Sequence, residues 1–307
     1  MGGKTTMTNK VVIIGCGNVG MSYAYALLNQ RTKVNEIVLI DLDQQRIDGE
    51  AMDLNHGLPF APSKIKIRAG SYDDCKDAAI ICICAGANQE KGETRLDLLS
   101  KNNLIFKSII DKIIPTGFDG IFLVATNPVD IMTYFTFKHS KFPAGKVIGS
   151  GTTLDTARLR YLIGDKLSVN PKNVHAYVMG EHGDSEFVLW SNAYVGSVSV
   201  QKFLEKSELD NISLQVKNAA YEIINRKGAT YYAIGMVLVR ITNAILDDEN
   251  TILTVSSYSK EHDIYIGMPS VVGKNGVTSL IEVNFTEEEK EKFSNSANII
   301  KKEVDKL

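Results

Sequence analysis

The sequence lacks both a long hydrophobic run and a strong excess of charge of one sign. The longest nearly pure apolar stretch, residues 78–87, is about half as long as a membrane-spanning helix. The 34 basic and 36 acidic residues leave a formal net charge of −2, which does not indicate a surface for nucleic acid or anionic lipid. No secretory signal is evident, because the first ten residues are polar and lead directly into an apolar segment. We therefore expect no membrane partner and no nucleic-acid partner.

Cysteine is also scarce. The four cysteines, Cys16, Cys75, Cys82 and Cys84, form no Cys-x-x-Cys pair and show no Cys/His spacing typical of metal ligands, so we expect no metal site. We interpret them as buried apolar residues of a protein in the reducing cytoplasm. A redox role for Cys82 and Cys84 is the weaker alternative, because alternate residues of a strand share a face without meeting disulfide geometry.

Glycine, by contrast, is concentrated where an apolar strand meets a helix. Residues 11–14, VVII, suit a strand buried on both faces, and helical spacing of apolar residues begins after Asn18. The G-x-G-x-x-G pattern of Gly15, Gly17 and Gly20 therefore lies in the strand-turn-helix context in which such a turn binds a dinucleotide pyrophosphate. A purely structural glycine turn is the alternative. The cofactor-binding residues that we predict here are Gly15, Gly17, Asn18, Val19 and Gly20.

A carboxylate at the end of the second strand supports the cofactor interpretation. The apolar run of residues 36–41 ends in Asp41, which lies 21 positions after Gly20. An acid about 20 residues after the glycines accepts a hydrogen bond from the ribose 2′-hydroxyl and repels the 2′-phosphate of NADP. We therefore predict NAD as the cofactor, although an aspartate at a strand end can also simply begin a turn.

The 307 residues predict two lobes. Apolar strands are expected at residues 11–14, 36–41, 64–68, 79–84, 120–125 and 146–148, with helical stretches between several of them. This alternation predicts an α/β fold with a doubly wound parallel sheet of the Rossmann type, followed by an α+β catalytic domain. We place the boundary near Gly149, giving domains 1–149 and 150–307, and expect residues 1–9 to be a mobile tail.

The second half offers candidates for proton transfer and substrate binding. His182, in GEHGD, is flanked by glycines that leave room for close approach, and imidazole titrates near neutral pH. Asp155 could orient it, although sequence alone cannot show that the two residues meet. Asp155 and Arg158 share one face of a helix that Thr152 or Thr153 can cap, where a surface ion pair is the ordinary interpretation. An arginine beyond a strand end could instead hold a substrate carboxylate with two parallel hydrogen bonds.

These segments together carry a family resemblance. The order GCGNVG, GANQEKGETRLDLL, ATNPVD, GSGTTLDTARLR and GEHGDSE resembles the lactate and malate dehydrogenase family, from about residue 10 to the C-terminus. The resemblance implies that His182 exchanges the proton and that Asp155 orients it. It also implies that Arg158 binds the substrate carboxylate and that Arg95 polarises the carbonyl from a loop that closes over the site. The remaining residues to which it gives roles are Asn127, near the reacting carbon and cofactor, Ser150, on the nicotinamide side, and Thr230, in the substrate pocket.

By the same resemblance, Gln89 stands at the position that determines which substrate is preferred. Similar malate dehydrogenases carry an arginine there, because the second carboxylate of oxaloacetate would otherwise be buried unpaired. The neutral amide favours pyruvate and L-lactate. Two departures bear on this: Glu90 and Lys91 stand where many lactate dehydrogenases have Lys-Pro, and residues 187–190, FVLW, lack a proline common there. The second departure resembles enzymes of larger 2-hydroxy acids, so a hydroxyisocaproate-type dehydrogenase is the alternative, ahead of malate dehydrogenase.

Two further basic residues suggest regulation. Arg160 lies two positions after Arg158, so it faces away from the substrate, where a solvated arginine is the ordinary interpretation. In similar bacterial lactate dehydrogenases the residues matching Arg160 and His175 form a fructose 1,6-bisphosphate site between subunits of a homotetramer. The resemblance therefore implies a homotetramer with a possible bisphosphate activator.

Two other classes of protein also contain such a glycine turn. An NAD-dependent glycosidase would require a metal-binding Cys/His set that the sequence does not show. A module that merely senses NAD would account for the first half of the chain. It would leave His182, Asp155, Arg158 and Arg95 without a role.

Overall fold

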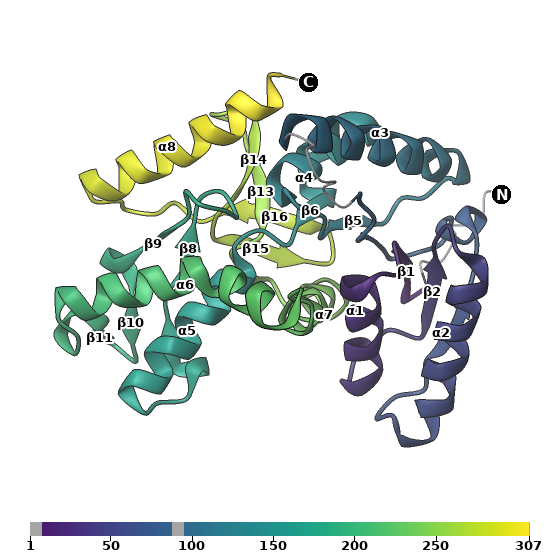
Figure 1. Cartoon of the computed structure of the whole chain (residues 1–307), viewed down its shortest axis with the longest axis horizontal. Helices are drawn as coiled ribbons and strands as arrows, with labels where there is room; N and C mark the ends of the chain where they lie inside the picture. The colour runs from purple at the N-terminus through teal and green to yellow at the C-terminus, as the bar shows by residue number, and fades with distance from the viewer. Residues whose placement is uncertain (1–7, 88–94, 307) are drawn as a thin grey trace.

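The computed structural model describes residues 8–87 and 95–306, and the side chain of Arg95 is not among the described groups (Figure 1). Gln89, Glu90 and Lys91 lie outside the described residues. Of the tail predicted at residues 1–9, two residues are described. Thr8 donates a hydrogen bond to the Asp77 carbonyl, and Asn9 accepts one from the backbone of Asn35, so both residues are bonded to the first half of the chain.

Within the described residues, the largest sheet has eight strands in the order β14-β13-β6-β5-β4-β1-β2-β3. The six strands from β6 to β3 are parallel, and the order in which they occur along the chain reverses between β4 and β1, as predicted for a doubly wound sheet. β13 and β14 extend the sheet with antiparallel pairing. The strands are β1 (Lys10–Ile14), β2 (Glu36–Ile40), β3 (Lys66–Ala69), β4 (Ile80–Ile83), β5 (Ile121–Val124), β6 (Val147–Gly149), β13 (Ser256–Ser259) and β14 (Ile264–Gly267).

Helices cover both faces of this sheet, which explains why its strands read as continuous apolar runs. On one face, α1 (Asn18–Asn29), α2 (Gln44–Gly57) and α7 (Tyr232–Leu246) enclose one core. On the other face, α3 (Arg95–Ile113), α4 (Val129–Ser140) and α8 (Glu287–Val304) enclose a second core. The fold class predicted from the sequence is confirmed.

The two halves of the chain share these cores. α7 lies against α1 (Figure 1), and the Tyr23 hydroxyl is 2.5 Å from the Thr242 hydroxyl across this contact. Gly235 allows the close approach, because a Cβ there would lie 2.8 Å from the Ser22 carbonyl oxygen. The second half of the chain is therefore packed closely against the helix that follows the glycine turn.

The rest of the second half packs around a third core formed by α5 (Thr153–Leu167), α6 (Lys206–Lys227) and several short strands. These strands are β7 (Val174–His175), β8 (Val178–Met179), β9 (Phe187–Val188), β10 (Tyr194–Val195) and β11 (Val198–Ser199). A hairpin is formed by β15 (Ser270–Gly273) and β16 (Gly276–Leu280), and β12 (Thr251–Leu253) lies alongside β15. Short 3₁₀ helices occur at Leu58–Phe60, Tyr72–Cys75, Ile114–Thr116, Ala144–Lys146, Pro171–Asn173, Trp190–Asn192 and Val200–Lys202.

Two local features differ from what the sequence suggests. Residues 174–180, VHAYVMG, are strand-like in sequence but form two strands, because β7 pairs with β10 whereas β8 pairs with β9. Threonines of the neighbouring helix hold β8: the backbone N–H of Val178 donates to the Thr156 hydroxyl, and the Val178 carbonyl accepts from the Thr152 hydroxyl at 2.7 Å. Thr152 takes the N-cap position of α5, but its hydroxyl is used for this contact and makes no capping bond.

Among the described residues, the structure contains no helix that combines the length and the apolar character needed to cross a membrane.

Candidate active site

The three glycines of the first turn differ in what surrounds them. Gly15 has a φ of +92°, and a Cβ on it would lie 2.3 Å from the backbone nitrogen of Ala85. A Cβ on Gly20 would lie 2.2 Å from the Gly15 carbonyl oxygen, whereas a Cβ on Gly17 would meet no atom within 4 Å. Gly15 and Gly20 are therefore required for the turn itself, and Gly17 borders open space.

This open space lies at the N-terminus of α1. Gly17 is the N-cap residue, makes no side-chain capping bond, and is followed by no acidic residue in the first turn. Asn18 is exposed and Val19 half-buried. A helix N-terminus without a carboxylate offers its backbone N–H groups and its positive dipole end to an anion. These residues therefore fit the pyrophosphate of a dinucleotide.

Asp41 follows β2 and is tied to the same turn. Its Oδ2 accepts a hydrogen bond from the backbone N–H of Cys16 at 2.7 Å and lies 3.0 Å from a guanidinium nitrogen of Arg46. Burial alone would raise the pKa of Asp41, but hydrogen bonds from the backbone N–H groups of Cys16 and Asp43 and the charge of Arg46 lower it below its ordinary value. The carboxylate is therefore ionised, as an acceptor for a ribose hydroxyl must be.

Arg46 was not identified from the sequence. Its second guanidinium nitrogen donates to the Cys16 carbonyl at 2.6 Å, so one arginine holds both the acid and the glycine turn. No motif marks an arginine at this place in α2. Its role follows from the packing of α2 beside the turn.

In the second half, the structure brings His182 and Asp155 together. Nδ1 of His182 lies 2.6 Å from Oδ2 of Asp155, although the two residues are 27 positions apart. Asp155, in the first turn of α5, is 1% exposed, and the side chain of His182 is 21% exposed. The pair is therefore shielded on the aspartate side and reachable on the histidine side.

Each member of the pair changes the proton affinity of the other. Burial alone would lower the pKa of His182, but the charge and the hydrogen bond of Asp155 more than reverse this and raise it to about 9. Burial alone would raise the pKa of Asp155, but His182 and Arg158 hold it below its ordinary value. At neutral pH the pair is therefore an imidazolium beside a carboxylate.

Arg158 completes this arrangement from the next turn of α5. Its Nη1 lies 2.7 Å from Oδ1 of Asp155, and its side chain is largely buried. The ion pair that could have been an ordinary surface pair is thus an interior one, beside the proton-carrying histidine. A partly exposed guanidinium in this position remains able to face an anionic substrate.

Asp130 is a site residue that the sequence reasoning missed. Its side chain is buried; Oδ2 accepts from the backbone N–H of His182 at 2.8 Å and Oδ1 from the Ser256 hydroxyl at 2.5 Å. Burial raises the pKa of Asp130 to about 6 against the effect of these two hydrogen bonds. The residue is the last of ATNPVD, so its motif was noticed, but nothing in the sequence links it to a loop 52 positions away.

The other predicted site residues lie as follows. Asn127 is exposed and precedes a cis peptide bond to Pro128, directly after β5. Ser150 is buried directly after β6, and its backbone N–H donates to the Val124 carbonyl at 2.9 Å. Thr230 is half-buried two residues before α7. Arg95 is the first residue of α3, but its side chain is not described, and Gln89 lies outside the described residues.

Arg160 contacts the two residues that follow His175 in the chain. Nε of Arg160 donates to the carbonyl oxygen of Ala176 at 3.2 Å, and its guanidinium carbon lies 5.4 Å from the centre of the Tyr177 ring. The exposed His175 in β7 is the residue before Ala176. Arg160 is thus anchored next to His175, whereas Arg158 faces Asp155 on another side of α5.

One group of described residues could offer three ligands to a metal ion: Asp155, His182 and Glu186, with the ligand atoms within 4.8 Å of one another. Both oxygens of Asp155 already contact donor groups, and one of these is the guanidinium of Arg158, which would repel a cation. We therefore interpret the group as one that holds a proton.

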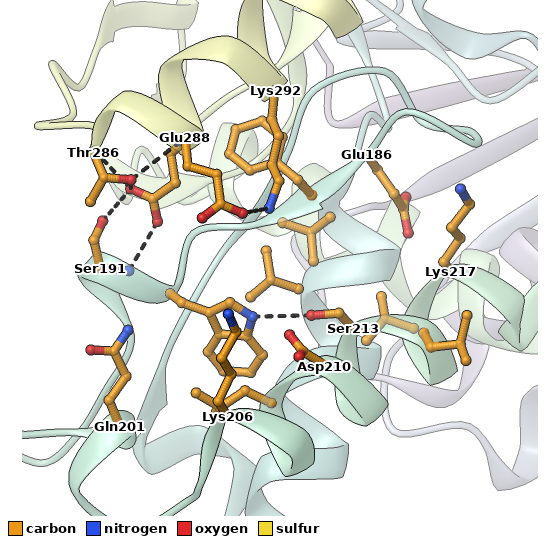
Figure 2. A pocket seen from close by; sticks show the side chains of 18 of the residues that line it. Glu186, Ser191, Gln201, Lys206, Asp210, Ser213, Lys217, Thr286, Glu288 and Lys292 are labelled. Carbon is orange, nitrogen blue, oxygen red and sulfur yellow. Dashed lines mark hydrogen bonds and ion pairs between the residues drawn. The ribbon is translucent and has the colours of Figure 1, made fainter.

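A cavity of about 860 Å³ lies behind this group, between β9, α6 and the start of α8 (Figure 2). Glu186 lines it, together with apolar side chains such as Phe187, Val188 and Trp190. His182, Asp155 and Arg158 do not line it. Glu186 is therefore the member of this group that borders the cavity.

The doubly wound sheet with its glycine turn and Asp41, and the His182–Asp155 pair held against it, are the arrangement of an NAD-dependent dehydrogenase. Residues 9–149 match the model of the lactate/malate dehydrogenase NAD binding domain, and residues 152–307 match that of the alpha/beta C-terminal domain of the same family. The chain belongs to the lactate/malate dehydrogenase family, as the resemblance in its motifs predicted.

Individual proteins similar to this chain support its assignment to this family. L-lactate dehydrogenase 1 of Peribacillus psychrosaccharolyticus is 51% identical over 97% of this chain and 96% of its own length. L-lactate dehydrogenase of Bacillus caldotenax is 54% identical over 95% of each chain. Among solved structures, the lactate dehydrogenase MGS-M5 from a Medee basin deep-sea metagenome library has a TM-score of 0.95 at 51% identity, covering 96% of this chain and 98% of its own. The ligand-bound minor L-lactate dehydrogenase of Enterococcus mundtii has a TM-score of 0.96 at 46% identity, covering 99% of each chain.

Proposed function

We propose that this chain is an L-lactate dehydrogenase, which reduces pyruvate to L-lactate with NADH and catalyses the reverse oxidation with NAD. The observation that carries the proposal is the buried Asp155 bonded to Nδ1 of His182, with Arg158 beside the same carboxylate. A 2-oxo acid needs one proton donor for its carbonyl oxygen and one cation for its carboxylate, and this group supplies both. The full-length likeness to L-lactate dehydrogenases supports the choice of reaction.

Bound NADH supplies the hydride in pyruvate reduction. His182 holds the proton on Nε2, the ring nitrogen that does not contact Asp155. This proton moves to the carbonyl oxygen of pyruvate, which becomes the hydroxyl group of lactate. Asp155 keeps the imidazolium in place by accepting from Nδ1. Because the pKa of His182 is raised to about 9, the proton is present at neutral pH before substrate binds. In the reverse direction the neutral imidazole accepts it.

The remaining roles follow the family pattern. Arg158 would hold the substrate carboxylate and Arg95 would polarise the carbonyl oxygen. Gly15, Gly17, Asn18, Val19, Gly20 and Asp41 would hold the adenosine and pyrophosphate portion of NAD. Ser150 would contact the nicotinamide side, Asn127 would hydrogen-bond near the reacting carbon, and Thr230 would line the substrate pocket. We keep the division into a cofactor domain, residues 1–149, and a catalytic domain, residues 150–307, as part of this proposal.

The experiment that tests this function follows NADH absorbance with pyruvate, oxaloacetate and 4-methyl-2-oxopentanoate in parallel. The highest kcat/KM is expected for pyruvate, because Gln89 offers no charge for a second carboxylate. A higher value for oxaloacetate would contradict the proposal in favour of malate dehydrogenase, and a higher value for the branched acid would favour a hydroxyisocaproate-type enzyme.

We also propose that the enzyme is a homotetramer that fructose 1,6-bisphosphate activates through Arg160 and His175. What supports it is the position of Arg160 beside exposed His175, where a symmetric interface would bring two copies of each together and make them repel. A bisphosphate would relieve the repulsion and favour assembly. The location that we propose is the cytoplasm, in keeping with four free thiols, Cys16, Cys75, Cys82 and Cys84.

The regulatory proposal is tested by pyruvate saturation with and without the bisphosphate, in the wild type and in Arg160→Gln. We expect the bisphosphate to lower the KM for pyruvate in the wild type. Activation that survives Arg160→Gln, or a wild type without any response, would refute it. Sedimentation of the same samples reports whether activation accompanies assembly.

A further inference from the structure

Glu186 is a titratable group in the catalytic cluster to which the mechanism above gives no role. It lies four residues after His182 and directly before β9. One oxygen of its carboxyl group lies within 4.8 Å of ligand atoms of both Asp155 and His182, and its side chain is hydrogen-bonded to Asp155. Glu186 also lines the cavity described above (Figure 2).

We propose that Glu186 is a positioning residue, a neutral carboxylic acid that donates its proton in a hydrogen bond to Asp155 and so holds that carboxylate toward His182. The proposal rests on the lactate dehydrogenase function proposed above. Glu186 itself touches neither substrate nor cofactor in this scheme, and acts through Asp155.

The argument begins with the bonds of Asp155. Its two oxygens accept from Arg158 at 2.7 Å and from His182 at 2.6 Å, and Asp155 is almost fully buried. A carboxylate has about four lone-pair sites, so further donors can be accommodated in its plane. The hydrogen bond with Glu186 supplies a third donor, which helps to keep the carboxylate beside the imidazole.

Two ionised carboxylates in contact repel each other, which favours a proton on one of the two. Burial and the charge of Asp155 raise the pKa of Glu186 to about 9, against the opposing charges of His182 and Arg158. The pKa of Asp155 is lowered by the cations that it contacts directly. The proton therefore resides on Glu186, which makes Glu186 the donor.

The charged groups around Glu186 come from several elements. His182 belongs to its own loop, and Asp155 and Arg158 belong to α5. Asp184, from the same loop, and Asp210 and Lys217, from α6, line the cavity that Glu186 also lines. Figure 2 shows the Glu186 carboxyl group and the Lys217 ammonium group at the same end of the cavity. Farther away at the start of α8, Glu288 and Lys292 pair with each other at 2.6 Å. Because Glu186 lines this cavity, its carboxyl group can exchange protons with solvent there.

The first test compares Glu186→Gln with Glu186→Ala, using pyruvate reduction at neutral pH. Glutamine keeps a donor of the same length and carries no charge, so kcat should stay within about twofold of the wild type. Alanine removes the donor, and kcat should fall about tenfold with little change in the KM for pyruvate. Glu288→Gln, at the rim of the same cavity and paired on the surface, is the matched control and should leave kcat unchanged.

Thermal unfolding of the variants accompanies the kinetics. If Glu186→Ala does not fold, the comparison of Glu186→Gln with the wild type decides the point alone. A glutamine variant with a large loss of kcat would overturn the proposal, because it would show that an ionised Glu186 is needed. Equal activity of the glutamine and alanine variants would overturn it as well, since no donor would then be required.

The second test does not depend on activity. Infrared difference spectra of the full-length wild type, recorded without substrate from about pH 7.5 to about pH 10.5, should show a protonated carboxyl C=O band that disappears as Glu186 ionises. Asp130, with a pKa of about 6, is already ionised in this range. The band should be absent from Glu186→Gln and present in Glu288→Gln.

The two proposals can fail separately. No protonated carboxyl band at pH 7.5, or a band that survives in Glu186→Gln, would overturn the assignment of Glu186 whatever the substrate is. A wild type that shows the band but does not reduce pyruvate would overturn the proposed function, and with it the role of Glu186 in that reaction.

Discussion

The glycine turn and the catalytic cluster are built in opposite ways. In the turn, Gly15, Gly17 and Gly20 lie within one strand-turn-helix segment, and the space around each glycine explains its presence. The cluster draws its parts from distant segments, so that the backbone of His182 is held by Asp130 and its ring by Asp155. The turn can bind an anion through backbone N–H groups that have no partner within the helix. The cluster instead holds a proton among buried side chains that are hydrogen-bonded to one another.

This difference decides how each region responds to substitution. A change in the turn affects backbone space, so it should alter cofactor affinity or folding and leave the proton chemistry intact. A change in the cluster alters charged side chains that interact with one another away from water. Electrostatic interactions between two such side chains are strong, so the change should alter their pKa values. Substitutions that separate these two outcomes therefore test the comparison.

The largest effect is expected from His182→Gln, which keeps a polar side chain but removes the proton carrier. We expect kcat for pyruvate reduction to fall about 10³-fold, while NADH binding followed by fluorescence titration stays unchanged. His56→Gln, at the exposed end of α2, is the matched control. A comparable loss of NADH affinity in His182→Gln would show that the two regions are not separable.

The next effect concerns substrate choice. Gln89→Arg should raise the ratio of kcat/KM for oxaloacetate to that for pyruvate by about 10²-fold, because it supplies the countercharge for a second buried carboxylate. Gln201→Arg, at an exposed position on the rim of the cavity, is the control and should leave the ratio unchanged. An unchanged ratio in Gln89→Arg would show that this position does not determine substrate choice.

In the glycine turn, Gly17→Ala separates binding from folding. Its φ of −77° suits alanine and a Cβ there meets no atom within 4 Å, so the melting temperature should stay near that of the wild type. The same Cβ would stand where the pyrophosphate approaches the helix N-terminus, and the Kd for NADH should rise about tenfold. Gly49→Ala, an exposed helical glycine with equally free space, should leave the Kd unchanged. Normal NADH affinity in Gly17→Ala would place the pyrophosphate elsewhere.

The smallest effect is a shift of pH dependence. Pyruvate reduction needs protonated His182, so it should persist below a pKa of about 9 and be lost as pH rises through it, while lactate oxidation should rise over the same range. Asp155→Asn removes the charge that raises this pKa, and both limbs should move at least about one unit toward lower pH. The surface variant Asp111→Asn should move neither limb. Limbs that stay in place in Asp155→Asn would mean that another group controls the proton.

Most of the fold could be predicted, because parallel strands enclosed by helices read as apolar runs separated by turn residues. The hairpin turn between Gly273 and Gly276 was predictable for the same local reason. The division of VHAYVMG into β7 and β8 was not, since it depends on the hydroxyls of Thr152 and Thr156 from another helix. A sequence pattern does not show which hydroxyl will reach which backbone group.

The candidate site was predictable in part. His182, Asp155 and Arg158 could be chosen by residue type and motif, and the structure places them in contact. Asp130 and Glu186 could not be assigned, although both lie inside motifs that carry the family resemblance. Their roles depend on burial and on neighbours far away in sequence, and burial of a charged group has no local signature.

By itself, the sequence determined the glycine turn, the acid that follows it and the order of strands and helices, because strand, turn and helix formation depend on neighbouring residues and on backbone sterics. The tertiary structure alone decided the contact of α7 with α1, the link from Arg46 to the Cys16 carbonyl, and the bonds of Asp130 and Glu186 within the catalytic cluster. These depend on which surfaces pack together. The proton affinity of His182 belongs with them, since Asp155 raises the pKa of His182 only after folding has brought the two side chains into contact and buried Asp155.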